Sequence, residues 1–368
     1  MEIKKIVITG GPCAGKTTGL SYLEQELTKM GYKIVFINES ATELILNGLD
    51  NGANKTNLDF ERNIIQLQVE KEKLYMEFCK NLPQDKVLLV CDRGVMDCKS
   101  YMTDYEFETA LKQLNLDKIQ VRDNYDAVFH LVTAAKGAEH AYTLANNQAR
   151  FETVEQAKDS DTKTMNAWTG HPHFRAIDNS TNFENKMKRL VKEICSFLGI
   201  PKPLEIERKF LINKPDLQLL ENMPNCQKVN IIQTYLISNK NEEKRVRQRG
   251  ENGSYIYTLT TKQKTDSKSA RQEIEQRISE KEYLTLLNNA DTNLHTVKKT
   301  RYCIMDNNRY YEIDIYPFAN STAICEIELT DENEAFELPS FIKLIKEVTN
   351  DKSYSNYSIA KKTPKDLK

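Results

Sequence analysis

The sequence predicts two folding units. Residues 1–199 are expected to form a doubly wound parallel α/β sheet of the P-loop NTPase or kinase type, and residues 200–368 an eight-stranded antiparallel β tunnel of the α+β class. Three observations predict this arrangement. The chain has 368 residues, and about 100–200 residues is usual for one domain. The hydrophobic period changes near residues 199–203, and a phosphate-binding motif follows the first apolar run.

Before residue 199, short apolar runs alternate with stretches of helical spacing. The runs predict buried parallel strands at 3–9, 33–38, 86–92, 127–132 and 174–177. Helical spacing covers residues 16–30, 58–81 and 183–198. Strands that alternate with helices are typical of a doubly wound α/β domain.

After residue 203, apolar and polar residues alternate with a period of two. This pattern predicts eight strands, at 204–212, 229–237, 243–249, 255–262, 271–278, 296–304, 310–316 and 322–329. Two further stretches have helical spacing, at 281–288 and 340–348. Many short strands with turns between them predict an antiparallel barrel or sandwich.

Composition excludes several classes of protein. There are 52 basic and 53 acidic residues, so we expect no nucleic-acid partner. The eight cysteines form no C-x-x-C pair and the five histidines no H-E-x-x-H motif, which indicates a reducing compartment and no zinc site. No apolar run approaches the ~20 residues of a membrane span, and the chain starts directly in a strand. We expect a cytoplasmic protein or one peripheral to a membrane, with no signal peptide or transmembrane segment.

A phosphate-binding loop follows the first predicted strand. The segment matches G-x-x-x-x-G-K-[ST] in full and consists of Gly10, Gly11, Pro12, Cys13, Ala14, Gly15, Lys16 and Thr17, with Thr18 next. Backbone N–H groups and the helix N-terminus would bind the polyphosphate of ATP or GTP, Lys16 would reach its terminal phosphates, and Thr17 would ligate Mg²⁺.

Other residues are predicted to meet at the same edge of the sheet. Asp92 ends an apolar run, as a Mg²⁺-positioning acid does. Glu39 ends another, and either accepts a proton from an acceptor hydroxyl or caps the next helix. Residues 136–161 include Arg150 and form either a mobile lid over the phosphates or a solvated loop and helix. The segment 171–173 is either a nucleoside-contacting loop or a structural turn.

The P-loop together with Asn38-Glu39-Ser40-Ala41-Thr42, Asp92-Arg93-Gly94 and Gly170-His171-Pro172 resembles the NadR-like P-loop kinase family over most of residues 1–199. The resemblance implies the fold of small nucleoside and nucleotide kinases. No guanine-selecting N-K-x-D motif occurs within residues 1–199, so ATP and GTP both remain candidates.

The predicted strands after residue 203 place charged side chains on one face. The charged sets are Glu205, Glu207 and Lys209; Arg245, Arg247 and Arg249; Lys262 and Lys264; Arg271, Glu273 and Glu275; Lys299 and Arg301; Glu312 and Asp314; and Glu326 and Glu328. An ordinary sheet with one wet face would explain one or two such strands. A closed barrel with a charged lumen and an apolar outer shell covered by helices explains all of them. A triphosphate with Mg²⁺ or Mn²⁺ would neutralise both signs of charge.

This half resembles the CYTH, or triphosphate tunnel metalloenzyme, family over residues 203–362. The resemblance rests on the E-x-E-x-K motif of Glu205, Glu207 and Lys209, on Gln233-Thr234-Tyr235-Leu236 and on Lys352-Ser353-Tyr354-Ser355-Asn356. It implies hydrolysis of tripolyphosphate, thiamine triphosphate or nucleoside triphosphates. It implies metal ligands at Glu205, Glu207, Glu326 and Glu328. It implies phosphate-binding residues at Arg245, Arg247, Lys262, Lys264, Arg301 and Lys352. By the same resemblance, Lys209 orients the attacking water or a terminal phosphate.

The two halves together resemble the TRPL translocation defect protein family, which is associated with GTP and phosphoinositide binding in membrane trafficking. Two hypotheses follow. The first is a metal-dependent triphosphatase joined to a nucleotide-binding kinase-like domain, with Lys209, Glu39 and Asp92 as catalytic candidates. The second is a GTP- and phosphoinositide-binding regulator with little or no catalysis. The many carboxylates of the charged strands favour the first, because a headgroup site requires cations.

Overall fold

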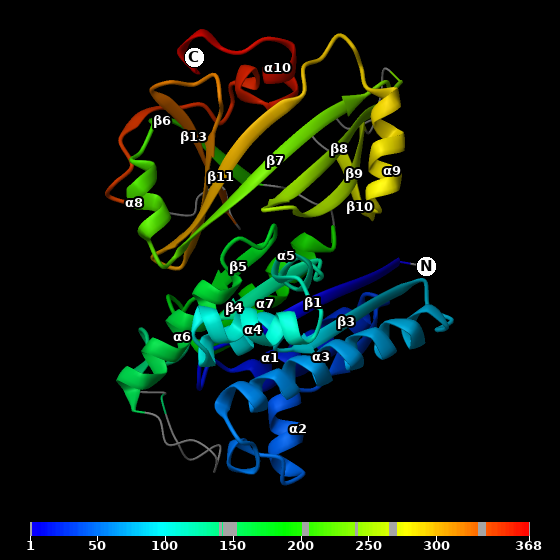
Figure 1. Cartoon of the computed structure of the whole chain (residues 1–368), viewed down its shortest axis with the longest axis vertical. Coiled ribbons are helices and arrows are strands. Elements are labelled where there is room, and N and C mark those ends of the chain that lie inside the picture. The colour runs from blue at the N-terminus through cyan, green and yellow to red at the C-terminus, as the bar shows by residue number, and fades with distance from the viewer. Residues whose placement is uncertain are drawn as a thin grey trace. The chain divides into compact units, whose positions relative to one another are not determined.

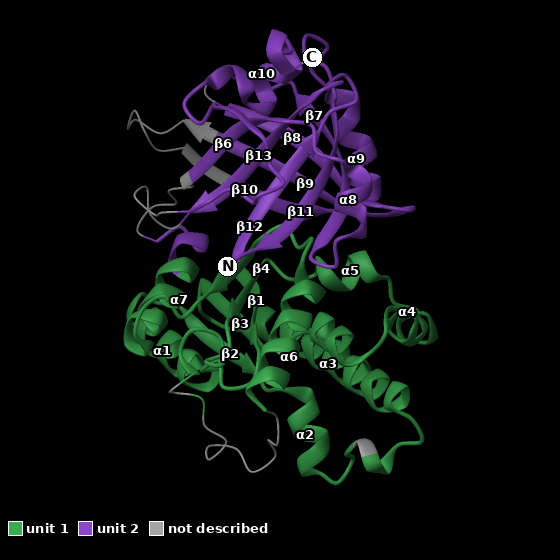
Figure 2. Ribbon diagram, turned by 90° about the vertical axis from the view of Figure 1, so that its left-hand side faces the viewer, with its two compact units in different colours: residues 1–194 green, residues 195–368 purple. Residues whose placement is uncertain are grey.

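The computed structural model describes residues 2–139, 142, 153–200, 206–239, 242–264, 271–329 and 336–367. Side chains are not described for Asn51, Ile206, Gln263, Lys264, Arg271, Gln272 and Glu273. The chain divides into two compact units, residues 1–194 and 195–368 (Figure 2). Each unit is described by itself.

The first unit is built on a five-stranded parallel sheet with the order β2-β3-β1-β4-β5 (Figure 1). Its strands are β1 (Glu2–Gly10), β2 (Lys33–Ile37), β3 (Lys86–Asp92), β4 (Ala127–Leu131) and β5 (Phe174–Ile177). All five lie where the apolar runs predict them. The P-loop strand β1 is central, and residues such as Ile6, Val90 and Phe129 are fully buried because helices cover both faces.

Helices connect these parallel strands, as parallel pairing requires. The main ones are α1 (Lys16–Lys29), α3 (Asn57–Lys80), α6 (Val154–Trp168) and α7 (Phe183–Phe197). Shorter elements are α2 (Ser40–Leu46), η1 (Asn51–Ala53), η2 (Val95–Tyr101), α4 (Asp104–Gln113) and α5 (Lys118–Arg122). Figure 2 shows α1 and α7 on one side of the sheet and α3 and α6 on the other. A Cβ on Gly19 of α1 would lie 3.0 Å from Leu190 of α7, so these two helices pack closely.

The second unit contains a nine-stranded antiparallel sheet with the order β10-β9-β8-β7-β11-β12-β13-β6-β14. The strands are β6 (Ile206–Asn213), β7 (Cys226–Leu236), β8 (Glu242–Glu251), β9 (Ser254–Lys264), β10 (Arg271–Ile278), β11 (Val297–Asp306), β12 (Arg309–Ile315), β13 (Thr322–Leu329) and β14 (Leu344–Glu347). Eight of them correspond to the eight predicted strands.

One face of this sheet is apolar and covered. Phe210, Tyr302, Ile313 and Cys325 belong to a buried cluster against which Leu217 and Met223 pack, around α8 (Leu217–Asn222). A second cluster on the same side of the sheet places Tyr283 of α9 (Glu280–Leu286) against β7, β8 and β9. The apolar outer shell is therefore present as expected, on the face opposite the charged side chains.

One expectation for this unit is wrong. A helix was expected at 340–348, but residues 344–347 form β14, which pairs with the edge of β6. The helical spacing is overridden because the N–H and C=O groups of β6 need partners, and Val348 N–H donates to Lys209 O at 2.8 Å. β14 makes the sheet one strand larger than the eight expected, and the nine-stranded antiparallel sheet is consistent with the expected β tunnel.

The end of the chain packs against the sheet. The elements there are η5 (Lys352–Tyr354), α10 (Asn356–Lys361) and η6 (Lys365–Leu367), whereas η4 (Leu287–Asn289) directly follows α9. Tyr354, Ile359 and Leu367 join Leu211 and Ile324 in a buried cluster. Among the described helices, none combines the length and apolar character needed to cross a bilayer.

Candidate functional sites

The P-loop lies between β1 and α1, at the carboxyl end of the central strand. Gly10 has a φ of 150°, and a Cβ there would lie 2.2 Å from the Leu131 carbonyl oxygen. Gly15 has a φ of 89°, and a Cβ there would lie 2.6 Å from the Phe183 ring. Both positions therefore require glycine. Lys16 begins α1 as a buried side chain, and residues 17–18 are exposed on its first turn.

Three consecutive P-loop carbonyl groups, those of residues 12–14, accept hydrogen bonds from outside the loop. The donors are Thr133 Oγ1 to Pro12 O, Ala134 N–H to Cys13 O at 3.4 Å, and Lys186 Nζ to Ala14 O at 3.1 Å. The C=O and N–H of a trans peptide point in opposite directions. The N–H groups of residues 13–15 therefore turn toward the inside of the loop, which produces an anion-binding concavity.

Asp161 of α6 also contacts the P-loop, a role that no sequence pattern predicted. Its carboxylate accepts hydrogen bonds from Gly11 N–H at 3.1 Å, Thr133 N–H at 2.9 Å and Lys136 Nζ at 2.9 Å. His130 Nε2 lies 3.0 Å from the same carboxylate. Burial raises the pKa of Asp161, but His130 and Lys136 outweigh burial and hold it well below the usual range. Asp161 is thus a buried anion that fixes the first part of the loop.

Charged side chains gather at the carboxyl edge of the sheet beside the loop. Arg93 follows β3 with a φ of 69°. Its Nε donates to Glu39 Oε1 at 2.5 Å and its Nη1 to Asp97 Oδ1 at 3.0 Å. Burial and the charge of Arg93 lower the pKa of Lys16. The structure therefore brings Lys16, Glu39 and Asp92 together, as the sequence predicted from strand ends alone.

Asp92 and Glu39 differ in their electrostatics. Burial, and secondarily the negative charge of Glu39, raises the pKa of Asp92. Its Oδ1 is buried and has no hydrogen-bond partner. For Glu39, burial acts in the opposite direction to Arg93 and Lys16, which lower the pKa to about 2. Glu39 occupies the N-cap position of α2 without a side-chain bond to the helix backbone. Its carboxylate is instead bound to Arg93.

Glu61 of α3 is a further buried carboxyl group near this edge. It is 5% exposed, and its Oε2 has no hydrogen-bond partner. Burial raises its pKa to about 7, although the Cys98 hydrogen bond and the charge of Arg93 act in the other direction. Sequence reasoning missed Glu61 because it lies within an ordinary amphipathic helix.

The histidine segment after α6 is a structural turn. His171 is fully buried, and its Nδ1 lies 3.0 Å from the His173 N–H. Its Nε2 lies 3.0 Å from the Tyr125 carbonyl oxygen. Both ring nitrogens are used within the protein, so the geometry favours the turn over a nucleoside-contacting loop. Arg150, the predicted lid residue, lies outside the described residues.

In the second unit, the strand register places the charged side chains on one side of the nine-stranded sheet. We call this side the charged face; its charged members with described side chains are Glu207, Lys209, Glu243, Arg245, Arg247, Arg249, Glu251, Lys262, Glu275, Arg277, Lys299, Arg301, Glu312, Asp314, Glu326 and Glu328. It lies opposite the apolar face, as the alternation of side chains requires.

The charged face is rich in carboxylates on β6, β12 and β13. Glu207 is directly opposite Glu328, and Glu312 is directly opposite Glu326. Like charges in such positions repel. Lys209 Nζ lies 2.8 Å from Glu207 Oε1 and 2.6 Å from Glu326 Oε1. The arrangement therefore requires cations between the strands, and Lys209 is one of them.

Arg301 of β11 is the second cation. It makes a two-pronged contact with Asp314, with Nε–Oδ1 and Nη2–Oδ2 distances of 2.7 Å. Its Nη2 also lies 2.8 Å from Glu326 Oε2, and its Nη1 contacts Glu312. Burial raises the pKa of Glu326, but Lys209 and Arg301 outweigh it and lower the pKa far below the usual range.

The other part of the charged face, on β8 to β10, is rich in arginine. Arg245, Arg247 and Arg249 alternate along β8, and Arg245 and Arg249 are less than 10% exposed. Arg247 Nη1 lies 3.6 Å from Glu275 Oε2. Burial raises the pKa of Glu275, and Arg247 and Arg245 outweigh it and lower the pKa. Lys262 lies on the same side of β9.

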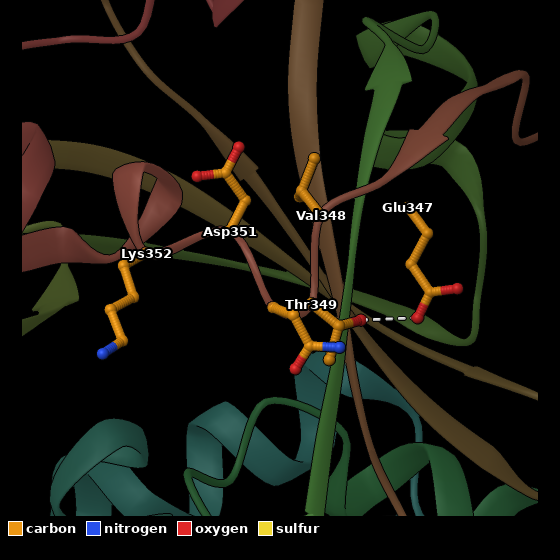
Figure 3. Close-up of a pocket in the computed structure, with 6 residues that line it drawn as sticks. Glu347, Val348, Thr349, Asp351 and Lys352 are labelled. Atoms are coloured by element: carbon orange, nitrogen blue, oxygen red, sulfur yellow. Dashed lines mark hydrogen bonds between the residues drawn. The ribbon is translucent and has the colours of Figure 1, made fainter.

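The remaining predicted phosphate-binding residue, Lys352, is exposed on η5. It lines a surface pocket together with residues 347–351 (Figure 3). In Figure 3 the side chains of Lys352 and Glu347 extend in different directions, and Glu347 accepts a hydrogen bond from Thr349 Oγ1 at 2.6 Å. No contact of Lys352 with the charged face was found among the described residues.

Comparison with protein families assigns both units. Residues 5–186 match the family model of the AAA domain, and residues 203–362 match that of the CYTH domain. The chain therefore combines a region that matches the AAA domain with a region that matches the CYTH domain, and the two regions are called by these names below. The match to the AAA domain covers the P-loop, and the match to the CYTH domain covers the whole charged face.

Several solved structures match part of this chain. The inorganic triphosphatase NE1496 is 29% identical, and the match covers 44% of this chain and 97% of that one with a TM-score of 0.33. The PH1819 protein from Pyrococcus horikoshii OT3 is 20% identical, with 35% and 81% covered and a TM-score of 0.27. No match was found among curated proteins.

The metal ligands expected in the CYTH domain are only partly visible. Glu205 lies outside the described residues, as does the side chain of Lys264. Within the described part, no three His, Cys, Asp or Glu side chains are grouped closely enough to hold a metal. The facing pairs Glu207–Glu328 and Glu312–Glu326 nevertheless supply oxygen donors in positions that require a cation. Carboxylate oxygens are the kind of donor that hard divalent cations such as Mg²⁺ and Mn²⁺ take.

Proposed function

We propose that the CYTH domain binds and hydrolyses a triphosphate chain with a divalent metal. The substrate class comprises tripolyphosphate and the triphosphates of nucleosides or thiamine, with release of phosphate or pyrophosphate. The observation that supports this best is the division of the charged face into a carboxylate-rich part and an arginine-rich part. A headgroup site would need only the second part.

Each residue has a proposed role in that reaction. Arg245, Arg247 and Lys262 bind phosphate oxygens, and Arg301 stabilises the charge that develops on the leaving oxygen. Lys209 orients the attacking water or the terminal phosphate. Mg²⁺ or Mn²⁺ held by Glu207, Glu326 and Glu328 would neutralise the terminal phosphates.

We further propose that the AAA domain binds the triphosphate of ATP or GTP in its P-loop. The inward N–H groups of residues 13–15 and the buried Lys16 support this role. The unpartnered Asp92 Oδ1 and the exposed Thr17 hydroxyl fit a hydrated Mg²⁺. For phosphotransfer, Glu39 stays the candidate proton acceptor. Its pKa of about 2 makes it a weak base until substrate separates it from Arg93.

The test is phosphate release from tripolyphosphate, ATP and GTP, with Mg²⁺ and then Mn²⁺. Four proteins are compared: wild type, Lys16→Ala, the double variant Glu207→Gln/Glu328→Gln, and the control Glu221→Gln. Glu221 is a carboxylate of α8, on the outer side of the same sheet. We expect the double variant to lose about 100-fold or more of the tripolyphosphatase activity. Lys16→Ala and Glu221→Gln should retain that activity.

Two other outcomes would redirect the assignment. Release lost only in Lys16→Ala would make the AAA domain the hydrolase. If the wild type releases phosphate from none of the substrates, the proposed hydrolase activity is contradicted and a phosphoinositide-binding regulator is favoured. Binding of the protein to phosphoinositide-containing vesicles would then test that alternative.

A further inference from the structure

We propose that Lys186 is a positioning residue that holds the P-loop in its anion-binding conformation; this inference rests on the nucleotide binding proposed for the AAA domain. Lys186 lies on α7 and is 2% exposed. Its Nζ donates to Ala14 O at 3.1 Å, Val132 O at 2.6 Å and Asn179 Oδ1 at 2.8 Å. One ammonium group thus connects the P-loop, the end of β4 and the loop after β5.

The contact with Ala14 determines the direction of one phosphate-binding group. The carbonyl of Ala14 and the N–H of Gly15 belong to one planar peptide and point in opposite directions. By accepting from Lys186, the carbonyl is held outward, and the Gly15 N–H is held toward the anion. Gly15 has a φ of 89°, so without this contact the glycine peptide is free to rotate.

A lysine suits this position because three oxygen acceptors surround it. An ammonium group has three N–H donors and no acceptor, so every hydrogen bond is satisfied. A neutral amine has only two N–H groups, and its lone pair would face an oxygen. Deprotonation of Lys186 would therefore replace one of the three hydrogen bonds by a repulsion between the lone pair and that oxygen.

The surroundings of Lys186 leave its charge incompletely compensated. Within the described residues, no carboxylate lies within ion-pairing distance of its Nζ. Asp161 and Asp178 act on it from farther away, and Arg189 opposes them. Burial is the main cause that lowers its pKa to about 8. A bound polyphosphate would provide negative charge across the loop and favour the protonated form, so nucleotide binding and protonation of Lys186 should promote one another.

A purely structural role would predict a different result. If Lys186 only joins α7 to β4, its loss lowers the stability of the fold and leaves the affinity of folded protein for nucleotide unchanged at every pH. If Lys186 positions the loop, affinity falls in the folded variant and the pH dependence changes as well.

The experiment measures the affinity of the full chain for a fluorescent ATP analogue between pH 6.5 and 9.5. The proteins are wild type, Lys186→Met, Lys186→Gln and the control Lys188→Met. Lys188 is exposed on the same helix and pairs with Glu184. At pH 7 we expect Lys186→Met to bind about tenfold more weakly, since a hydrogen bond to a charged group is lost. The control should match wild type.

The pH profiles provide the second readout. Wild-type affinity should fall as the pH rises through about 8, and this part of the fall should be absent in Lys186→Met. Lys16, whose pKa is also lowered, titrates in both proteins, so the difference between the profiles isolates Lys186. Lys186→Gln keeps two N–H donors, and it replaces Lys186→Met in the comparison if the methionine variant fails to fold.

The outcomes separate the two proposals. Absence of ATP binding by the wild type would overturn nucleotide binding, and this inference with it. Wild-type binding with equal affinity and an unchanged pH profile in the folded variants would overturn the role of Lys186 alone.

Discussion

Replacement of Arg301 by methionine examines the charged face most directly. Methionine preserves most of the aliphatic volume and removes the guanidinium group. In the wild type this group contacts Asp314, Glu326 and Glu312. Asp314 keeps Lys299 and Glu326 keeps Lys209, whereas for Glu312 no second cation was found among the described contacts. Compared with the wild type, the variant therefore keeps the same three buried or half-buried carboxylates but has one cation fewer to neutralise them.

The structure allows the magnitude to be worked out. Removal of one partner from a buried ion pair costs about 3–5 kcal/mol. The Arg301 side chain is 14% exposed, so solvent screens the remaining carboxylates only slightly. Because two of the three carboxylates keep a lysine, we expect the lower end, a loss of about 3 kcal/mol in the free energy of unfolding. A divalent cation at the same carboxylates would restore part of the loss, up to about 2.7 kcal/mol at 100 times its Kd.

Urea denaturation followed by circular dichroism, with and without MgCl₂, measures both effects. The control is Arg208→Met, which removes a partly exposed arginine that pairs with Glu347 at 2.6 Å and lies over the Phe210 and Phe336 rings, and it should cost less than Arg301→Met, about 1 kcal/mol. We expect Mg²⁺ to stabilise Arg301→Met more than the wild type. A loss below about 1 kcal/mol, or equal stabilisation of both proteins by Mg²⁺, would refute the reasoning.

Two further predictions concern the AAA domain. Glu61→Gln should raise the free energy of unfolding by as much as about 3 kcal/mol at pH 8 and leave it unchanged near pH 4. The reason is that the folded-state pKa of about 7, against an ordinary 4.5, makes the carboxyl group progressively destabilising as the pH rises between these values. Equal effects in urea titrations at both pH values would contradict this. Gly11→Ala should abolish binding of a fluorescent ATP analogue, since a Cβ there would lie 2.6 Å from the Cβ of Asp161; undiminished affinity would show that the loop tolerates the clash.

Local sequence patterns predicted the parts of the fold that depend on local rules. The motif of Gly10 to Thr17 predicts a phosphate site because it lies between a predicted strand and a predicted helix. Charged residues at every second position, as in Arg245 to Arg249, predict one charged face of the strand, because side chains alternate along a strand. This prediction does not require the order of the strands in the sheet. Asp92 follows from the rule that parallel strands bind ligands at their carboxyl ends.

The contacts that hold these groups in place could not be predicted in this way. Gly11 and Asp161 are 150 residues apart, and Ala14 and Lys186 are 172 apart. Nothing in the local sequence around Asp161 or Lys186 differs from an ordinary helix surface. The error at residues 340–348 has the same origin, because the spacing is compatible with a helix and only the unpaired edge of β6 decides for a strand.

Lys209 and Arg301 interact with the carboxylates of the charged face in the ligand-free state and would interact with the triphosphate in the bound state. Without ligand, Lys209 and Arg301 neutralise the carboxylates of β6, β12 and β13. A triphosphate would compete for these cations, and the facing pairs Glu207–Glu328 and Glu312–Glu326 would then repel one another unless a divalent metal replaced them. Metal and triphosphate should therefore bind with positive coupling, each raising the affinity for the other by the same factor. Calorimetric titration of a non-hydrolysable tripolyphosphate analogue into the wild type, with and without Mn²⁺, measures that factor after correction for the metal bound by the free analogue. A corrected factor of one would mean that the carboxylates do not belong to the phosphate site.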